Sequence, residues 1–187
     1  EEDEEEIFRS IESRRDLEAV LLCDYNKGTF KGNLAQKVIS HCDAKGIPTF
    51  VDPKLENVHN FKNAYLIKPN YKEAREIAGS QYKETEEIAK RIKELTKCKN
   101  LLISLGERGI FVYNEESTVV PTKKREVVDV VGAGDTVLAA ATLAYISGAN
   151  LHQAAQIANY AAGIVIGKRG TAYTTQDELI REILEGK

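Results

Sequence analysis

Residues 129–136 read DVVGAGDT and stand directly before a long apolar stretch with the spacing of a helix. Gly132 and Gly134 have no side chains, so the backbone there can approach a ligand, and free N–H groups at a helix start bind anions. Asp135 then lies at the mouth of this anion site. A carboxylate there repels a bound anion, so its presence indicates a function, for example as a general base that takes the proton of a hydroxyl. The alternative is an ordinary helix start, with glycine for the turn and aspartate for the helix dipole.

Short apolar runs alternate with helical patterns upstream of this stretch. The runs are residues 19–23, 47–51, 64–67 and 101–104. They lack period-two alternation, which is typical of strands buried on both faces. Between them, two stripes have helical spacing: Leu34, Val38 and Cys42, and Ile88, Ile92 and Leu95. Strands that alternate with helices predict a mostly parallel sheet with helices on both faces.

The pattern changes after Gly106. Residues 110–113 and 118–120 read as a hairpin, and two apolar helices follow, one from the 132–134 turn to Ser147 and one over 151–165. The sequence contains no recognisable boundary to a second domain. It therefore predicts one α/β domain of three layers, α/β/α, around a doubly wound and mostly parallel sheet.

Composition excludes several classes of function. The 187 residues include 26 Lys and Arg against 29 Asp and Glu, a net charge of −3, without a basic block, so no nucleic-acid partner is indicated. No apolar stretch approaches the roughly 18 residues of a membrane span, and no export signal is visible. Three widely spaced cysteines fit neither a disulfide framework nor a zinc site. We therefore expect a protein of the cytoplasm that does not bind membranes.

At this point the chain resembles a known family. Residues 129–135 are similar to the D-x-x-G-A-G-D signature of the ribokinase-like (PfkB) family of ATP-dependent sugar kinases. Further segments follow in the family's order: residues 68–73 (KPNYKE) resemble its N-x-x-E motif, 104–109 (SLGERG) its phosphate-handling turn, and 159–171 its adenine-side helix and loop. Four such segments together are far more specific than a single glycine motif.

Two more segments narrow the resemblance. Residues 23–28 (CDYNKG) and 51–54 (VDPK) look most like segments of D-glycero-D-manno-heptose 7-phosphate kinases, the kinase part of bifunctional proteins of ADP-heptose and lipopolysaccharide biosynthesis. The resemblance implies transfer of the γ-phosphate of ATP to the sugar phosphate, giving the 1,7-bisphosphate. Two alternatives stay open: a PfkB kinase for another sugar, of the ribose- or fructose-phosphate type, and a non-catalytic nucleotide-binding fragment.

The resemblance also implies roles for particular residues. Asp135 would be the general base toward the anomeric hydroxyl. Gly132, Ala133 and Gly134 would form an anion hole with their N–H groups. Asp24 and Lys27 would bind the sugar phosphate, although Lys27 by itself reads as an exposed turn lysine.

The nucleotide side is implied in the same way. Asn70 and Glu73 would organise Mg²⁺ and the ATP phosphates, with water between Glu73 and the metal; they also read as a helix N-cap with a capping-box glutamate. Ser104, Gly106 and Gly109 would line the triphosphate, and Asn159 would lie beside the adenine.

The family's amino-terminal part is missing from the pattern. That part holds most sugar contacts and a small β-sheet that serves as lid and often as dimer interface, so we interpret residues 1–187 as the carboxyl-terminal, nucleotide-binding portion of a single ribokinase-like kinase domain. Whether the chain is a fragment, a processed chain or an incompletely resolved one stays open. The full-length protein could then be a homodimer, and whether it carries a nucleotidyltransferase domain stays open.

The acidic run and the absence of Met agree with this interpretation. Residues 1–6 are all acidic and are expected to form a mobile, solvated segment. Without them, 23 acidic residues face 26 basic ones. We expect Lys27, Lys54 and Lys68 to face an anionic crevice.

Overall fold

The computed structural model describes residues 2–123 and 125–185. Within them, six strands form one sheet in the order β1-β2-β3-β4-β5-β6. They are β1 (Val20–Cys23), β2 (Thr49–Asp52), β3 (Leu66–Ile67), β4 (Asn100–Ser104), β5 (Ile110–Tyr113) and β6 (Ser117–Val120). The first four strands are parallel, and β5 pairs antiparallel with both β4 and β6. The predicted mostly parallel sheet and its terminal hairpin are therefore confirmed.

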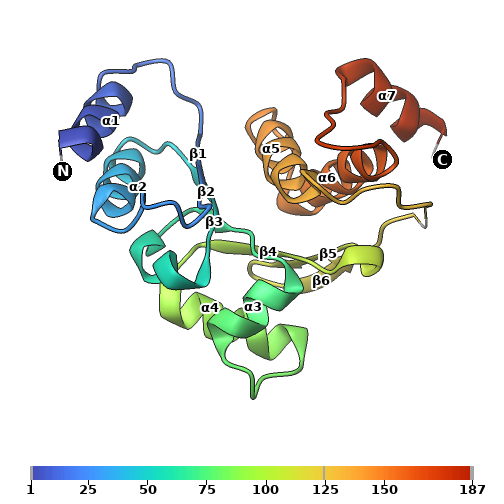
Figure 1. Cartoon of the computed structure of the whole chain (residues 1–187), viewed down its shortest axis with the longest axis horizontal. Coiled ribbons are helices and arrows are strands. Elements are labelled where there is room, and N and C mark those ends of the chain that lie inside the picture. Colours follow the sequence, from blue (N-terminus) through green and yellow to red (C-terminus); the bar gives the residue numbers. More distant parts are fainter. Residues whose placement is uncertain (1, 124, 186–187) are drawn as a thin grey trace.

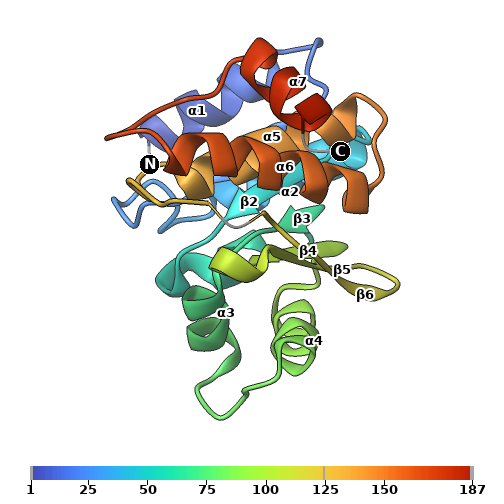
Figure 2. The same ribbon diagram turned by 90° about the vertical axis from the view of Figure 1, so that its right-hand side faces the viewer.

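Helices cover both faces of the sheet (Figures 1 and 2). They are α1 (Glu2–Glu12), α2 (Leu34–Ala44), α3 (Tyr71–Ala78), α4 (Thr85–Thr96), α5 (Ala133–Ile146), α6 (Leu151–Ile166) and α7 (Gln176–Glu185), with short 3-10 helices η1 (Leu55–Phe61) and η2 (Gly106–Arg108). The buried side chains of α2, α3 and α4 join one core cluster, and those of α5 and α6 join another. Among the described residues, no helix has both the length and the apolar character needed to cross a membrane.

The strands separate these two cores. Phe50, Leu66 and Leu102 are buried in the core beside α5 and α6. Val51 and Ile67, their chain neighbours on β2 and β3, are buried in the opposite core. Because successive strand residues point to opposite faces, strands covered on both sides have to be apolar throughout, which explains why the sequence shows no alternation.

The predicted helical stripes are mostly buried. Leu34, Val38 and Cys42 lie fully inside the core, as do Ile88 and Ile92. Leu95 is the exception: its side chain is 36% exposed near the end of α4. Small residues on α6, among them Ala154, Ala155 and Ala158, are completely buried. Without larger side chains between them, α5 and α6 pack closely together on the sheet.

Most of the segment at residues 1–6, which was expected to be mobile, is helical in the structure. Residue 1 lies outside the described residues, but residues 2–6 belong to α1. The Nζ atom of Lys37 on α2 lies 2.8 Å from Glu5 Oε2, and the Phe8 ring meets His41 edge-on, with 5.7 Å between ring centroids. The acidic run continues into an amphipathic helix, so its helical state comes from the docking of the apolar face and not from the charges alone.

Gly109 makes the turn between β4 and β5 possible. Its φ is 94°, and its carbonyl accepts a hydrogen bond of 2.7 Å from the Leu105 N–H. A β-carbon at this position would lie 2.1 Å from the Val120 carbonyl oxygen, which is far inside van der Waals contact. Only glycine can therefore bring η2 so close to the end of β6.

We predict that Gly109→Ala lowers the free energy of unfolding by about 3 kcal/mol or more, because it combines strain at positive φ with a backbone clash. Gly46→Ala is the matched control, since Gly46 has φ 70° and open space around it. The Gly46→Ala substitution should lower the free energy of unfolding by only about 1–2 kcal/mol. Urea denaturation measures both, and equal losses would contradict the close approach at Gly109.

Candidate functional site

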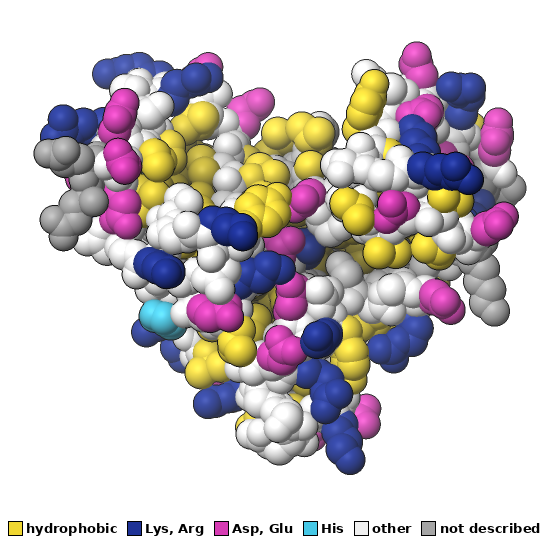
Figure 3. Space-filling model, in the orientation of Figure 1, with side chains coloured by type: hydrophobic (Ala, Val, Ile, Leu, Met, Phe, Trp, Pro, Cys, Tyr) yellow, Lys and Arg dark blue, Asp and Glu magenta, His cyan; other side chains and the backbone are white. Residues whose placement is uncertain are grey.

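A cleft of about 920 Å³ opens at the carboxyl ends of the parallel strands. Figure 3 shows the molecule hollowed between the part carrying α1 and α2 and the part carrying α5 to α7, with acidic and basic side chains meeting near the centre. The strand ends supply Cys23, Asp52, Lys68 and Ser104. In open α/β sheets, ligands bind at this edge.

The cleft brings together nearly all residues predicted for the site. Its lining includes Asp24, Asn70, Glu73, Ser104, Gly106, Gly109, Gly132, Ala133, Gly134, Asp135 and Asn159. Lys54 and Lys68 also line it, as expected. Lys27 does not: it is an exposed residue of the loop after β1 and is not among the lining residues. The expectation that Lys27 faces the crevice therefore stays a prediction, although Tyr25 of the same loop does line the cleft.

The predicted anion hole lies at the first turn of α5. Gly132, with φ 82°, is the N-cap of this helix. The Ala133 N–H donates to the Val130 carbonyl at 3.2 Å. Among the described residues, the N–H groups of Gly134 and Asp135 have no acceptor. The Gly132 N–H likewise has no acceptor among the described residues, so the N–H groups left for an anion are those of Gly132, Gly134 and Asp135, whereas the Ala133 N–H is already used within the turn.

Asp129, at the start of the same motif, holds two loops together. Its carboxylate accepts hydrogen bonds from the N–H groups of Val131 at 3.0 Å and Gly170 at 3.1 Å. These N–H donors hold the pKa of Asp129 below its usual range. Asp129 therefore joins the glycine turn to the loop after α6, which the sequence had associated with the adenine.

That loop is fixed from its other side by α7. Lys168 Nζ donates to Glu178 at 2.7 Å and to the Tyr173 carbonyl at 2.8 Å. Lys168, and after it the Thr175 N–H, lowers the pKa of Glu178 to about 2. The ion pair and the Asp129 hydrogen bonds together define the position of residues 168–175 beside the cleft.

An ion pair lies directly beneath the anion hole. Lys68 Nζ and Asp52 Oδ2 are 3.0 Å apart, and the Lys68 side chain is only 2% exposed. A β-carbon at Gly134 would lie 3.6 Å from Lys68 Nζ, which places the ammonium group next to the start of α5. Burial raises the pKa of Asp52, and Lys68 opposes that shift. A buried ammonium at a helix N-terminus makes this part of the cleft suited to phosphate.

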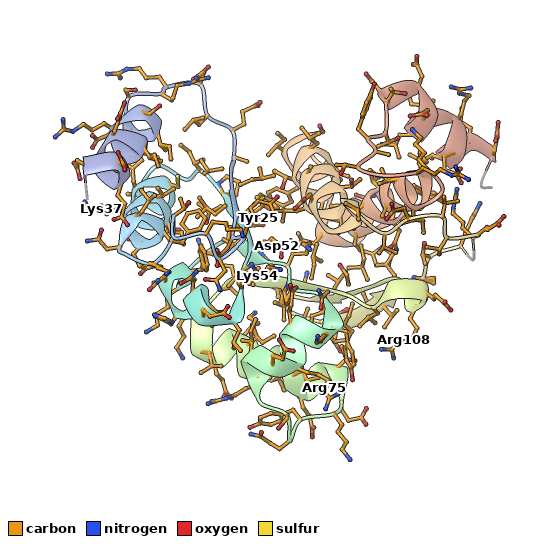
Figure 4. All side chains as sticks on the ribbon, in the orientation of Figure 1. Tyr25, Lys37, Asp52, Lys54, Arg75 and Arg108 are labelled. Carbon is orange, nitrogen blue, oxygen red and sulfur yellow. The ribbon has the colours of Figure 1, made fainter. Side chains whose placement is uncertain are left out.

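The start of α3 forms the facing wall. Asn70 Oδ1 accepts from the Glu73 N–H, and Glu73 Oε2 accepts from the Asn70 N–H, both at 2.9 Å. The capping box predicted from the sequence is thereby confirmed. The other Glu73 oxygen, Oε1, forms an ion pair with Lys54. Figure 4 shows Lys54 beside Asp52 and Tyr25 at the centre of the molecule.

Asp24 fixes the loops that follow β1 and β2. Its Oδ1 accepts from the Asn26 N–H at 2.8 Å, and its Oδ2 accepts from the Lys54 N–H at 3.2 Å and from Asn57 Nδ2 at 3.0 Å. The residue is 4% exposed. Although Asp24 lines the cleft, both of its oxygens are thus engaged inside the protein, and its principal effect is to hold the Lys54 backbone in place.

Two buried polar atoms of the cleft have no hydrogen-bond partner in the described part of the chain. They are Asp52 Oδ1 and Ser104 Oγ. Buried polar groups are normally satisfied, so such atoms in a cleft indicate a ligand or water site. Carboxylate oxygens are the protein ligands that Mg²⁺ prefers, and free N–H groups with Lys68 suit phosphate oxygens. The residues present therefore fit a nucleotide that carries Mg²⁺.

Another part of the cleft wall is mostly apolar. Apolar side chains of Val127, Ala162 and Ile166 line it. Asn159 donates from Nδ2 to the carbonyls of Val120 at 2.9 Å and Pro121 at 3.3 Å, so it fixes the end of β6 to α6. These surfaces suit a flat, largely apolar group such as a nucleobase.

Sequence reasoning missed several residues of this site. Arg125 lines the cleft, lies against Gly163 and pairs with Glu182 of α7. Tyr25 is 59% exposed, yet burial and the nearby Asp135 charge raise its pKa. Asp52 and Cys23 each end a buried strand. Because ligands bind at the carboxyl ends of parallel strands, that position could have indicated both residues from the sequence. No sequence signal pointed to Arg125, because its place depends on the packing of α6 and α7.

The sequence matches the family model described as pfkB family carbohydrate kinase over residues 10–178. It is 37% identical over 183 residues to "Bifunctional protein HldE" of Aliarcobacter butzleri (strain RM4018), covering 96% of this chain and 38% of that relative. A protein of the same name from Campylobacter concisus (strain 13826) is 41% identical over 165 residues, covering 86% of this chain and 34% of the relative. The chain thus spans little more than a third of these relatives.

Solved structures share the fold. Phosphofructokinase-2 from Escherichia coli in complex with potassium has a TM-score of 0.87 at 20% identity, with 100% of this chain and 63% of that chain covered. Arabidopsis thaliana ribokinase complexed with ribose and ATP has a TM-score of 0.76 at 19% identity, with 95% and 58% covered. The predicted three-layer, ribokinase-like fold is therefore confirmed.

We predict that Lys68→Met destabilises the protein by about 3–5 kcal/mol, because Asp52 would be left buried without its partner. The double variant Lys68→Met/Asp52→Leu should recover most of this loss. Lys90→Met is the control. Lys90 pairs with Glu86, and both side chains are more than half exposed, so the loss of this ion pair should lower the free energy of unfolding by only about 0.5 kcal/mol. Urea denaturation provides the values, and a Lys68→Met loss as small as that of the control would refute a buried charge pair.

Proposed function

This chain belongs to the pfkB family of carbohydrate kinases, and we propose that it is the nucleotide-binding and catalytic part of an ATP-dependent sugar kinase. One observation carries the proposal. Asp135 stands at the start of α5, where the N–H groups of Gly134 and Asp135 have no acceptor among the described residues and the Lys68 ammonium lies below Gly134. A base, an anion hole and a cation converge there, as phosphoryl transfer requires.

In the proposed reaction, Asp135 accepts the proton of a sugar hydroxyl. The sugar oxygen then forms a bond to the γ-phosphorus of ATP, the bond from that phosphorus to the β,γ-bridging oxygen breaks, and ADP leaves. The N–H groups of Gly134 and Asp135 stabilise the negative charge on the transferred group. Asp135 is an exposed residue at the cleft, so an acceptor sugar can reach it.

ATP would occupy the cleft between the glycine turn and α3. Ser104, Gly106 and Gly109 would border the triphosphate, and the adenine would lie beside Asn159 on the apolar wall. Asn70 and Glu73 would hold Mg²⁺, Glu73 through water, with Asp52 nearby. When bound, Mg²⁺ would supply charge neutralisation to the phosphates.

The proposed acceptor is D-glycero-D-manno-heptose 7-phosphate, converted to its 1,7-bisphosphate in ADP-heptose and lipopolysaccharide biosynthesis in the cytoplasm. Support comes from residues 23–28 and 51–54, which resemble heptose 7-phosphate kinases, and from the similarity to proteins named HldE. Lys27, an exposed residue of the loop after β1, stays a candidate for the sugar's own phosphate. Asp24 stays one for the sugar and also holds the loop.

We predict that Asp135→Asn lowers kcat by about 10²- to 10⁴-fold while the affinity for ATP stays nearly constant, because the base is lost and the N–H groups stay. Steady-state kinetics and calorimetric ATP binding measure the two effects. Asp177→Asn is the control, since Asp177 is an exposed acidic residue in the first turn of α7. Turnover of Asp135→Asn at the level of this control would remove Asp135 as base.

A panel of acceptors tests the substrate. Heptose 7-phosphate, fructose 6-phosphate, fructose 1-phosphate and ribose are compared by ADP release, using the longest polypeptide that carries residues 1–187. We expect the highest kcat/KM with heptose 7-phosphate. Preference for another sugar would replace the substrate and retain the kinase, whereas ATP binding without transfer to any sugar would favour a non-catalytic nucleotide-binding fragment.

A further inference from the structure

Two lysine–carboxylate pairs lie in the cleft, and they differ in exposure. Lys68 is 2% exposed and its partner Asp52 14%. Lys54 is 36% exposed and its partner Glu73 16%. Removing Lys68 from Asp52 would leave both charges buried and unpaired, which is costly. Lys54 can leave Glu73 and still reach solvent, so only this second pair can open without a large penalty.

The hydrogen bonds of Glu73 leave one oxygen for other partners. Oε2 accepts from the Asn70 N–H and is committed to the helix cap of α3. Oε1 faces Lys54. A hydrated divalent cation held by Glu73 would therefore approach the oxygen that the Lys54 ammonium already occupies. Two cations at one oxygen repel each other, so the metal and the ion pair exclude one another.

The backbone of Lys54 is fixed by a hydrogen bond, whereas its long side chain is partly exposed. The Lys54 N–H donates to the buried Asp24 carboxylate, which Asn57 also binds. The following residues Leu55–Phe61 form η1, with the Asn57 N–H donating to the Lys54 carbonyl at 3.1 Å. An ammonium released from Glu73 would thus stay within the cleft on its flexible stem, close to whatever anion the cleft holds.

We propose that Lys54 is a displaceable counter-ion of Glu73. In the empty cleft it neutralises the carboxylate, and on binding of a metal nucleotide it leaves Oε1 and moves to a phosphate group. This rests on the proposed binding of ATP with Mg²⁺, but not on the identity of the sugar or on catalysis. Lys54 is thereby a positioning residue that couples metal binding to nucleotide binding, whereas Lys68 is a fixed charge.

The test uses Mn²⁺ as the probe, without nucleotide, and measures its binding by electron paramagnetic resonance. Lys54→Met should bind Mn²⁺ about fivefold more tightly than the unaltered protein, because Glu73 Oε1 is released. Lys54→Arg, which can still pair with the carboxylate, should bind as weakly as the unaltered protein. Lys90→Met removes the same charge from an exposed lysine–glutamate pair on α4 and should leave Mn²⁺ affinity unchanged.

A second substitution tests whether the increase in Mn²⁺ affinity depends on Glu73. The gain from Lys54→Met should disappear in Lys54→Met/Glu73→Gln, and Lys54→Met should weaken binding of a non-hydrolysable ATP analogue in the absence of metal by about fivefold. The proposal is overturned if folded Lys54→Met binds Mn²⁺ no more tightly, if Lys90→Met gives the same gain, or if the gain survives Glu73→Gln. All readouts are binding measurements, so a failure of phosphoryl transfer would not affect them.

Discussion

The ion pair between Lys68 and Asp52 is the interaction on which the cleft depends. It joins the residues that directly follow or end two neighbouring parallel strands, and it lies beneath the first turn of α5. A lysine with 2% exposure needs a charged partner, so the presence of Asp52 is a condition for placing positive charge under the anion hole. Asp52 keeps one buried oxygen, Oδ1, without a hydrogen-bond partner among the described residues. Burial and charge are thus linked in one pair, next to the position proposed for the phosphates.

Around this pair, the cleft divides into parts that are held and parts that can move. Asp24 and Asp129 fix loops through N–H groups, and Gly109 allows the turn after β4 to lie against β6. Side chains that end in the cleft are less constrained: Tyr25 is exposed, and the partly exposed Lys54 side chain forms an ion pair with Glu73. A kinase needs fixed N–H donors where charge develops and adaptable cations where charged ligands enter and leave. The distribution of hydrogen bonds matches that division.

Much of the site was predictable, because its residues lie next to local signals. Asp135 sits in a glycine-rich helix start, and Asn70 and Glu73 form the capping box that their spacing indicates. The family is confirmed, and so is the fold. The spacing was less informative about individual groups: Lys27 is exposed and is not among the residues that line the cleft, and the Ala133 N–H donates to the Val130 carbonyl within the turn. Residues 2–6 belong to a helix that contacts Lys37 and His41 of α2. The acidic run itself contains no pattern from which these contacts could be predicted.

The sequence by itself determined the order of strands and helices, their burial on both faces and the glycine turn before α5, because each depends on residue spacing, side-chain volume and backbone freedom within a short segment. Only the tertiary structure decided which charges meet. Lys68 pairs with Asp52 and Lys54 with Glu73 across gaps of 16 and 19 positions in the chain, and Arg125 reaches Glu182 across 57. Such pairs form because parallel strands end at one edge of the sheet and because α6 and α7 pack together, and no local pattern encodes either distance.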